Sequence, residues 1–267
     1  MFWTQIEGRA FWISFLAAFA AVGVWETFRP RVALVASPGR RWGSHGILLL
    51  LCASASMVLY RTGLLMTAVA VEGNRFGLLN KPWAPFALRC IIGFLLLDLV
   101  RYIRHLVSHS IPFLWRPHSV HHSDPDYDLT TGARFHPLEV VISKGLYLGV
   151  IIILAPPAAA VFVSEIVTLF QGFFTHANAA LPDRIEKPLR AIFVTPEMHR
   201  IHHSDEAGEQ MSNYGDIFPW WDRLFGTYVH TPAAGQERMR TGLKGFQDAK
   251  SANIFFMLTA PFRRMAE

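Results

Sequence analysis

Two copies of one histidine pattern dominate the chain and point to metal chemistry. The copies begin at His118 and His199, and each places three histidines at positions i, i+3 and i+4. On a helix, at about 100° per residue, three such side chains fall within an arc of roughly 100° on one face. Neutral imidazoles are common metal ligands, so three that converge would make a metal site or half of one. Two copies of so specific a pattern argue against coincidence.

Further histidines extend this set of candidate ligands. A pair at positions i and i+4 precedes the first copy, and a single histidine follows the run Phe-Phe-Thr. His136, in Arg-Phe-His-Pro-Leu-Glu, is a tenth candidate, either as a ligand or as a group on the substrate side. The candidate ligands are His105, His109, His118, His121, His122, His136, His176, His199, His202 and His203.

The number of candidate ligands constrains the kind of site. A zinc site takes four protein ligands or fewer, and nine or ten imidazoles are too many for any single ion. Two ions with four or five nitrogens each would leave positions open for oxygen or water. Imidazole suits zinc, copper, iron and nickel alike, so the ligand type does not select the metal. The residue after His105 is Leu106, so the His-Glu-x-x-His pattern of metalloproteases is absent there.

Carboxylate and amide side chains near the histidines are candidates to hold the ligand rings. Ser-Asp follows each triplet, so Asp124 and Asp205 either accept an imidazole N–H or simply end a helix. Asp98 lies within an apolar run, where a carboxylate indicates a functional role, although an ion pair with Arg101 explains it equally well. The supporting candidates are Asp98, Asp124, Asn178, Asp205 and Asp222.

Long apolar runs must position these side chains. Hydrophobic residues make up 52% of the chain. They concentrate in four runs, at about 10–28, 46–71, 85–107 and 140–174. Runs of this length predict an integral membrane protein. Arg61 falls inside the second run, which is therefore two helices or one helix that faces the protein interior. Pro156-Pro157 breaks the fourth, which predicts a helical hairpin that enters the membrane and returns.

The net charge of +5 is explained by membrane topology better than by nucleic acid. Basic residues flank the apolar runs and form no stripe on a soluble face. Four arginines between Arg29 and Arg41 predict a cytoplasmic loop. Counting spans from that loop returns the chain to the cytoplasm at His105 and, after the hairpin, at His176. We therefore expect every clustered histidine on the cytoplasmic side.

Helix starts are predicted directly before both triplets. Thr195-Pro196-Glu197 combines an N-cap residue, a proline at the first helical position and an acidic first turn. Arg116-Pro117 precedes His118 in a similar way. The triplets should therefore lie on real helices.

The sequence resembles the fatty acid hydroxylase superfamily, the membrane-bound di-iron enzymes that include sterol desaturases. The resemblance covers roughly residues 95–230, and the motifs are specific as a set. These motifs are His105-x3-His109, His118-x2-His121-His122, Arg134-Phe-His136-Pro-Leu-Glu139, His176-Ala-Asn178, Thr195-Pro-Glu-Met-His199-x2-His202-His203, and Asn213-Tyr-Gly through Trp221-Asp-Arg-Leu-Phe-Gly-Thr-Tyr228. Some relatives carry a second histidine four residues after the one matching His176, whereas here Ala180 stands at that position.

The resemblance implies an all-α fold, an integral membrane helical bundle with a cytosolic histidine-rich helical cap. It also implies two iron ions and the use of O2 to hydroxylate or desaturate a sterol or fatty-acyl type lipid from the bilayer. Electrons would come from a separate ferredoxin- or cytochrome b5-like carrier, since the chain has no dinucleotide-binding Gly-x-Gly-x-x-Gly motif after a strand. The tenth ligand would be His136, a water, or a group held by Asn178.

Three parts of the chain are expected on this basis. Residues 1–84 would be N-terminal transmembrane helices, and residues 85–235 the catalytic domain, including the proline-broken hairpin at 140–175. Residues 236–267 would form a tail, in which 252–264 is either a helix in the membrane interface or a helix packed on the domain.

Other classes of protein fit the pattern less well. A membrane metal transporter or sensor is the main alternative, but it would place ligands along the spans rather than at their ends. A bis-histidine haem needs two opposed ligands and has no use for the adjacent pair His121 and His122. A zinc hydrolase needs fewer ligands.

Overall fold

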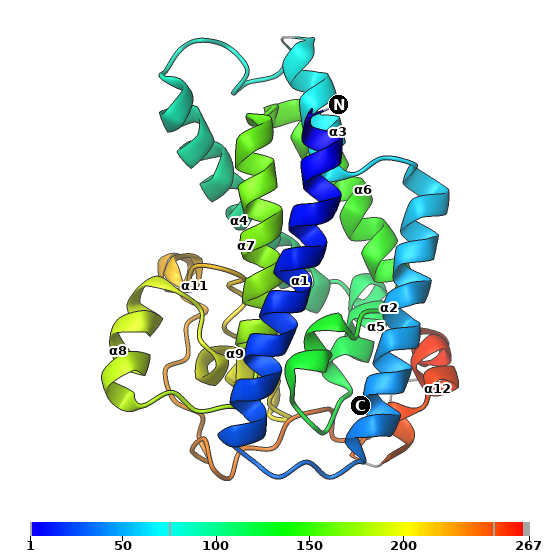
Figure 1. Cartoon of the computed structure of the whole chain (residues 1–267). Coiled ribbons are helices and arrows are strands. Elements are labelled where there is room, and N and C mark those ends of the chain that lie inside the picture. The colour runs from blue at the N-terminus through cyan, green and yellow to red at the C-terminus, as the bar shows by residue number, and fades with distance from the viewer. Residues whose placement is uncertain (1, 75, 248, 264–267) are drawn as a thin grey trace.

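Helices account for all regular structure that the computed structural model describes, which comprises residues 2–74, 76–247 and 249–263 (Figure 1). Within those ranges, strand-type pairing is limited to two isolated bridges, Pro30 with Ala179 and Ser204 with Thr241. The all-α prediction is confirmed.

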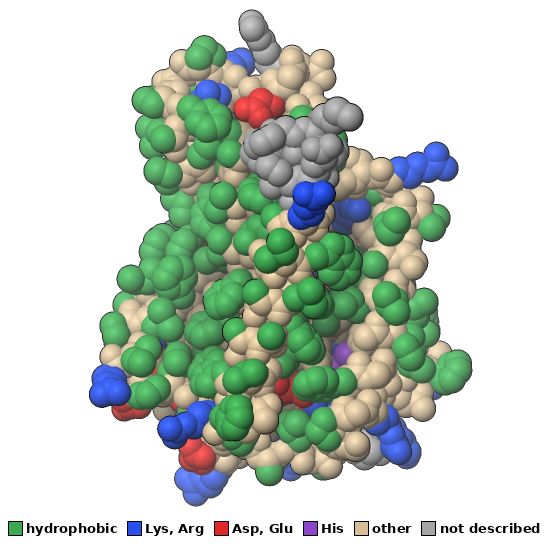
Figure 2. Space-filling model, in the orientation of Figure 1, with side chains coloured by type: hydrophobic (Ala, Val, Ile, Leu, Met, Phe, Trp, Pro, Cys, Tyr) green, Lys and Arg blue, Asp and Glu red, His purple; other side chains and the backbone are tan. Residues whose placement is uncertain are grey.

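Long apolar helices form a bundle that a membrane can surround. Four stretches of the described chain are long and apolar enough to cross one, namely Gly8–Phe28, Pro38–Gly73, Pro137–Leu154 and Ala158–Thr175. They correspond to α1 (Phe2–Phe28), α2 (Pro38–Tyr60) with α3 (Leu64–Gly73), α6 (Pro137–Leu154) and α7 (Ala158–Thr175). Figure 2 shows hydrophobic side chains over the middle of this face, with most charged side chains toward its two ends. The chain is an integral membrane protein.

The second apolar run forms two helices rather than one. Arg61 ends α2 in the left-handed conformation, with φ of 49°, and its N–H donates to the carbonyl of Met57. The Arg61 side chain is exposed. A similar break separates α6 from α7, where Ala155 has φ of 46° and Pro156 and Pro157 follow.

The expected third span, α4 (Phe86–Ser110), is not among the four apolar stretches. Arg89, Asp98, Arg101 and Arg104 put too many charges into it. Two of these charges are satisfied inside the protein, because Arg101 donates to Ser164 Oγ of α7 and Asp98 accepts from Trp221 Nε1. The helix still runs down the bundle and ends in the histidine-bearing half of the molecule (Figure 1).

Short helices form a cap at the end of the bundle that also holds the loop between α1 and α2 (Figure 1). They are α5 (Pro112–His122), η1 (Leu129–Ala133), α8 (Asp183–Ile192), α9 (Pro196–His202), α10 (Ala207–Gln210), α11 (Trp220–Phe225), η2 (Ala249–Ala252), α12 (Ile254–Thr259) and η3 (Ala260–Phe262).

The two predicted helix starts have different outcomes. The start of α9 at Pro196 is confirmed, and the Thr195 hydroxyl accepts from the Met198 N–H at 3.3 Å. The start at Arg116-Pro117 is wrong, because α5 begins at Pro112 and carries Pro117 inside it. Proline fits a first helical turn, and Pro112 already occupies that place.

Of three hydrophobic clusters, the first and third join the bundle to the cap, and the second lies within the bundle. One packs Ala18 and Val22 of α1 against Phe173 of α7 and Leu129 of η1. The second, between α3, α4, α6 and α7, includes the fully buried Ile151. The third joins α2, α5 and α12 through residues Leu48, Val120 and Met257. The tail helix α12 is therefore packed on the domain.

Candidate metal centre

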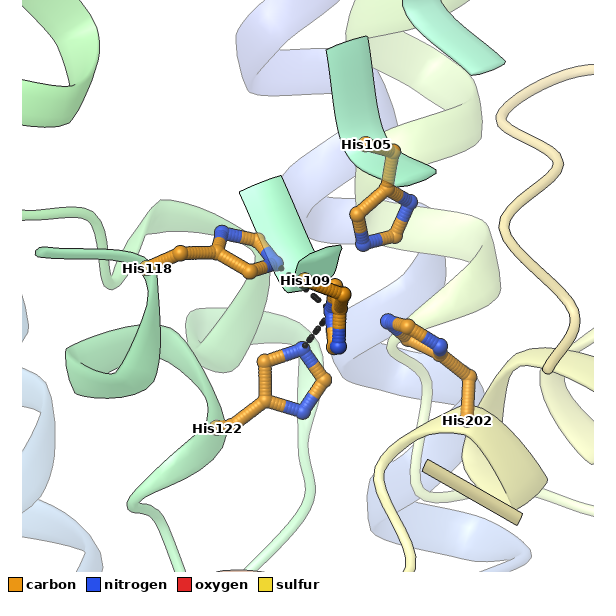
Figure 3. A group of neighbouring side chains, drawn as sticks. All are labelled: His105, His109, His118, His122 and His202. Atoms are coloured by element: carbon orange, nitrogen blue, oxygen red, sulfur yellow. Dashed lines mark hydrogen bonds between the residues drawn. The ribbon is translucent and has the colours of Figure 1, made fainter. Parts of the chain in front are cut away.

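Nine of the ten candidate histidines converge in two buried groups. Within each group, the nitrogen atoms that could bind a metal all lie within 4.8 Å of one another. All nine side chains are at most 7% exposed. The first group, drawn in Figure 3, is His105, His109, His118, His122 and His202, and the second is His121, His176, His199 and His203.

Each triplet serves both groups. In the first triplet, His118 and His122 point to one group, while His121 points to the other. In the second triplet the division is reversed, because only His202 points to the first group, while His199 and His203 point to the second. The i+3 side chain lies about 100° around the helix from the i+4 side chain, which lets one helical turn face two sites. The triplets thus do not aim at a single point.

The remaining candidate ligands come from the ends of long helices. His105 and His109 lie in the last turns of α4, and His176 is the C-cap residue of α7. Close packing brings η1 up to this end of α7, because a Cβ at Gly132 would stand 2.7 Å from the Gly172 carbonyl oxygen. Glycine at 132 is therefore needed for that approach.

The distances between imidazoles fit shared metal ions. His109 Nε2 lies 3.1 Å from Nε2 of both His118 and His122 (Figure 3). His176 Nε2 lies 3.3 Å from His121 Nε2 and 3.2 Å from His199 Nε2. Two nitrogens that bind one ion at about 2.1 Å, at right angles to each other, are about 3 Å apart. The spacing therefore matches neighbouring ligands on one ion.

Unpartnered nitrogens give a second test of the fit. Among the described residues, Nε2 of His105, His202 and His203 is buried and has no hydrogen-bond partner. Burying a polar atom without a partner costs roughly 1–3 kcal/mol, and native proteins rarely do so without a reason. A metal ion in each group would use these lone pairs. The residues present therefore fit a pair of ions.

Four of the rings are oriented through their other nitrogen. Nδ1 of His105 donates to the Tyr214 carbonyl at 2.9 Å, and Nδ1 of His202 donates to the Ser212 carbonyl at 2.7 Å. At the same distance of 2.7 Å, His176 Nδ1 contacts the Gly172 carbonyl and His118 Nδ1 contacts Glu139 Oε1. A proton held on Nδ1 leaves the Nε2 lone pair free for a metal.

Burial keeps the cap histidines neutral. It lowers the pKa of His176 to about 4 and that of His202 to about 3. Burial, with help from neighbouring imidazoles, also lowers the pKa of His121, His199 and His203 well below the usual value. Neutral imidazole is the form that binds metal, so these side chains are ready to bind at pH 7.

Glu139 was missed as a supporting residue by sequence reasoning, although it closes one of the motifs. The sequence signal was a carboxylate in the first turn of an apolar run. Its Oε1 also accepts from Arg104 Nη1 at 2.9 Å. His136, three residues earlier, lies in neither group. It caps α6 by accepting the Leu138 N–H at 3.1 Å, and its Nε2 lies 3.3 Å from the Leu258 carbonyl.

Asp222 acts on the site through a loop. It accepts the N–H groups of Tyr214 and Gly215 at 2.7 and 2.8 Å, and the Thr227 hydroxyl at 2.7 Å. Tyr214 in turn supplies the carbonyl that orients His105. A side chain at Gly215 would collide with this arrangement, because its Cβ would stand 2.8 Å from Asp222 Oδ2.

Asp98 also supports the cap rather than an imidazole. It accepts from Trp221 Nε1 at 2.8 Å and from the Ile217 N–H at 3.1 Å. Among the described residues, Arg101 forms no ion pair with Asp98. It contacts Asp216 at 3.6 Å and donates to Ser164 instead.

Three further candidates hold connections between segments. Asp124 binds Arg41 at 2.7 Å and so ties α2 to the loop that follows the first triplet. The Asp205 N–H donates to the Arg240 carbonyl at 2.9 Å. The Asn178 amide exchanges two hydrogen bonds with the Val32 backbone, at 3.1 and 2.9 Å.

Two cavities adjoin the first group. One, of about 320 Å³, lies between α4, α5 and α6 and is lined mostly by aliphatic side chains. The other, of about 490 Å³, is lined by residues from α1 to α4 and from α6 and α7. Both include Arg104 and Glu139 in their walls, beside His105 and the partner of His118. Volumes of this size suit small-molecule ligands.

Comparison with known proteins adds independent findings. The fatty acid hydroxylase family model matches residues 90–227. The chain is 32% identical to an ornithine lipid hydroxylase, OlsE, of Rhizobium tropici over 148 residues, which are 55% of this chain and 44% of the relative. It is 29% identical to the alkylglycerol monooxygenase of Homo sapiens over 164 residues, 61% of this chain and 35% of the relative.

A third relative extends the range of named lipids. The methylsterol monooxygenase 1 of Rattus norvegicus is 26% identical over 159 residues, which are 58% of this chain and 52% of the relative. The chain thus spans about a third to a half of the length of these curated relatives. No solved structure matches it significantly.

Proposed function

This chain belongs to the fatty acid hydroxylase family, and on that premise we propose that it is a membrane-bound di-iron oxygenase that hydroxylates or desaturates a lipid with O2. The observation that carries the proposal is the convergence of nine imidazoles from separate segments into two buried groups. Five ligands would hold one iron and four the other, which leaves positions open for oxygen or water.

The roles of the chain's own residues follow from their contacts. When bound, the two irons would supply the reduction of O2 and the attack on an unactivated C–H bond. The carbonyls of Tyr214, Ser212 and Gly172 would keep three ligand rings in place. The burial of all nine imidazoles would exclude bulk water from the reaction.

A lipid is the substrate class that the surroundings favour. The cavity between α4, α5 and α6 is lined mostly by apolar side chains, and Glu139 in its wall contacts His118 of the first histidine group. Its walls belong partly to helices with exposed aliphatic side chains, such as Ile103 and Leu146, which would face the bilayer. The three relatives described above are named for oxidation of lipids. Sterol and fatty-acyl lipids are both within the proposal.

We place the active site on the cytoplasmic side and infer a separate electron carrier. The histidine end of the bundle also holds the loop with Arg29, Arg31, Arg40 and Arg41, which supports the cytoplasmic assignment (Figure 1). A ferredoxin- or cytochrome b5-like protein would deliver electrons there. We also keep the division into N-terminal helices 1–84, catalytic domain 85–235 and tail 236–267.

A metal transporter or sensor gains no support. Its ligands would follow the spans, whereas here they gather at helix ends and in the cap. The relatives described above are oxygenases rather than transporters.

Lipid mass spectrometry tests the proposed activity. A strain that expresses the chain should accumulate a lipid with one oxygen more, or two hydrogens fewer, than the parent lipid. A strain that expresses His121→Ala at equal membrane abundance should not. Identical lipid profiles in the two strains, with the protein iron-loaded, would contradict the proposal.

A further inference from the structure

An ion pair stands in the shared wall of the two cavities. Arg104 Nη1 lies 2.9 Å from Glu139 Oε1, and both residues line both cavities. Glu139 is 5% exposed, and its Oε1 already accepts from Arg104 and from His118. Its other oxygen, Oε2, is buried without a hydrogen-bond partner, and so is Arg104 Nε. One acceptor and one donor thus remain unused beside the proposed metal centre.

The two unpartnered atoms, Glu139 Oε2 and Arg104 Nε, belong to residues in a mostly apolar cavity wall. Apart from Ser108 and Ser143, the other residues that line the first cavity are apolar, such as Val100, Ile103, Val107 and Leu146. A buried carboxylate oxygen with no partner is costly in such surroundings, unless a ligand supplies the missing hydrogen bond. A lipid that filled the cavity with its chain would bring only its polar group to this point.

The charges of the pair select the kind of polar group. A hydroxyl or an amide can donate to Glu139 and accept from Arg104, and it adds no charge to the pair. A free carboxylate would gain from Arg104 but would be repelled by Glu139 a few ångströms away. A free ammonium would meet the opposite conflict. The pair therefore favours neutral groups that both donate and accept.

We propose that Arg104 and Glu139 recognise a hydroxyl or amide group of the lipid and select against free fatty acids. This inference rests on the proposed function, because it takes the adjoining cavity as the lipid site. It narrows the substrate to a neutral polar lipid whose hydroxyl or amide lies close to the oxidised carbon. Glu139 thereby has two roles, since the same carboxylate also orients His118.

Equilibrium binding to the full chain, purified after iron-replete expression, tests this selection without turnover. The probes are radiolabelled hexadecanol, hexadecanamide and palmitate, measured in nanodiscs without O2 or reductant, at a pH where palmitate is ionised. We expect the alcohol and the amide to bind about tenfold more tightly than palmitate. Equal affinities for the three probes would overturn the proposal.

Two substitutions should move the selectivity in opposite directions. Glu139→Gln removes the repulsion, so the preference over palmitate should fall below about threefold, mainly because palmitate binds more tightly. Arg104→Met removes the only cation of the pair, so the preference should rise above that of the parent chain. Glu165→Gln, which removes a carboxylate from the wall of the second cavity, is the matched control and should keep the preference. An unchanged preference in both Glu139→Gln and Arg104→Met would overturn the proposal.

Iron analysis of each variant separates this inference from the proposed function. If binding selectivity changes as expected but the chain holds no iron, the lipid site stands and the oxygenase proposal fails. If iron is bound and lipids are oxidised but the three probes bind equally, only the recognition by Arg104 and Glu139 fails.

Discussion

His121 and His202 show how single residues decide the arrangement of the centre. Each sits in a triplet whose other two members face the opposite group. Sequence spacing identifies these residues as candidate ligands, because i, i+3 and i+4 share a helix face. It does not divide them between two ions, because that division depends on how α5 and α9 are rotated toward each other. In the structure, α5 packs against α4 and α9 packs against α7.

Replacement of His202 should empty the first group while the fold remains. His202→Ala removes one of five ligands, so we expect at least about a 100-fold loss of lipid oxidation and reduced iron per chain. The control is His230→Ala, which changes an exposed histidine outside both groups and should keep both properties. Iron analysis and lipid product, measured at equal membrane abundance, give the result. Full oxidation by His202→Ala would remove this residue from the ligand set.

Asp222→Asn tests the support behind His105. Asparagine would turn an N–H group toward the Tyr214 or Gly215 N–H, both of which now donate to the carboxylate. The Tyr214 carbonyl should then shift, and we expect metal affinity to fall by about 10- to 100-fold. Competition with a chelator measures that affinity. Asp205→Asn is the control, because the Asp205 carboxylate contacts Arg240 and not this loop. Equal affinities would show that this loop does not hold the ligand.

The residues that hold the histidine rings in place were the part of the site that the sequence predicted least well. Among the described residues, none of Asp98, Asp124, Asn178, Asp205 and Asp222 hydrogen-bonds to a histidine of the two groups. Three ligand rings are held by backbone carbonyls, which every residue possesses and no sequence pattern marks. Of the four rings oriented through Nδ1, only that of His118 is held by a side chain of a quoted motif, Glu139.

Among the elements, α2 is tied to the first triplet by a buried group of charges. Arg41 contacts Asp124 at 2.7 Å and Asp128 at 2.5 Å, and Arg134 lies 3.8 Å from Asp124. Burial opposes the ionisation of Asp124, but the charges of Arg134 and Arg41 outweigh it and hold the pKa of Asp124 at about 2. The loop after α5 is thereby fixed while Asp124 is ionised.

Acid should loosen this connection. The pKa of Asp124 is lower in the folded chain, at about 2, than the 3.8 of an unperturbed aspartate, so its ionisation stabilises the fold above pH 4. That contribution, about 2 kcal/mol, should be lost as the pH falls from 4 toward 2. Thermal unfolding in detergent across this range measures it. Asp124→Asn should destabilise the chain at pH 7 by about 3–5 kcal/mol and remove this part of the pH dependence. The exposed Asp183→Asn is the control and should keep the pH dependence of the parent chain. If Asp124→Asn lost as much stability between pH 4 and pH 2 as the parent chain does, the assignment to Asp124 would be contradicted.

Local sequence signals predicted some element boundaries and not others. Thr195 and Pro196 set the start of α9 through a side-chain cap, which depends only on neighbouring residues. The start of α5 was missed, because Pro112 takes the N-terminal position and the helix tolerates Pro117 one and a half turns later. From the sequence, Arg61 in the second apolar run indicated either two helices or one helix that faces the protein interior. Its left-handed backbone and exposed side chain resolve them in favour of two helices.

At the scale of the whole molecule, the histidine end and the arginine-rich loop share one end of the bundle (Figure 1). The long apolar runs in the sequence were enough to predict a membrane protein, because runs of this length are typical of membrane-spanning helices. The path of α4 was harder to predict, since its charges are satisfied by Ser164, Asp216 and Trp221 from distant segments. Convergence of the ligands likewise depends on tertiary packing that no local pattern encodes.

Topology reporters test the orientation of the molecule. The tail helix α12 packs against α2 and α5, so the tail should lie on the same side as the histidines. A green fluorescent protein fused after residue 267 should therefore fluoresce, and alkaline phosphatase fused there should be inactive. The reverse result would put the site on the other side of the membrane. Fusions in the 74–85 connection, at the opposite end of the bundle, provide the control with the opposite expectation.

The metal content of the purified full chain tests the central claim most directly. Two buried groups of imidazoles, with five and four members, should each hold one ion. Elemental analysis after iron-replete expression should give about two metal ions per chain, and a chain with both His121→Ala and His199→Ala should give about one. One ion or none in the parent chain would contradict the account.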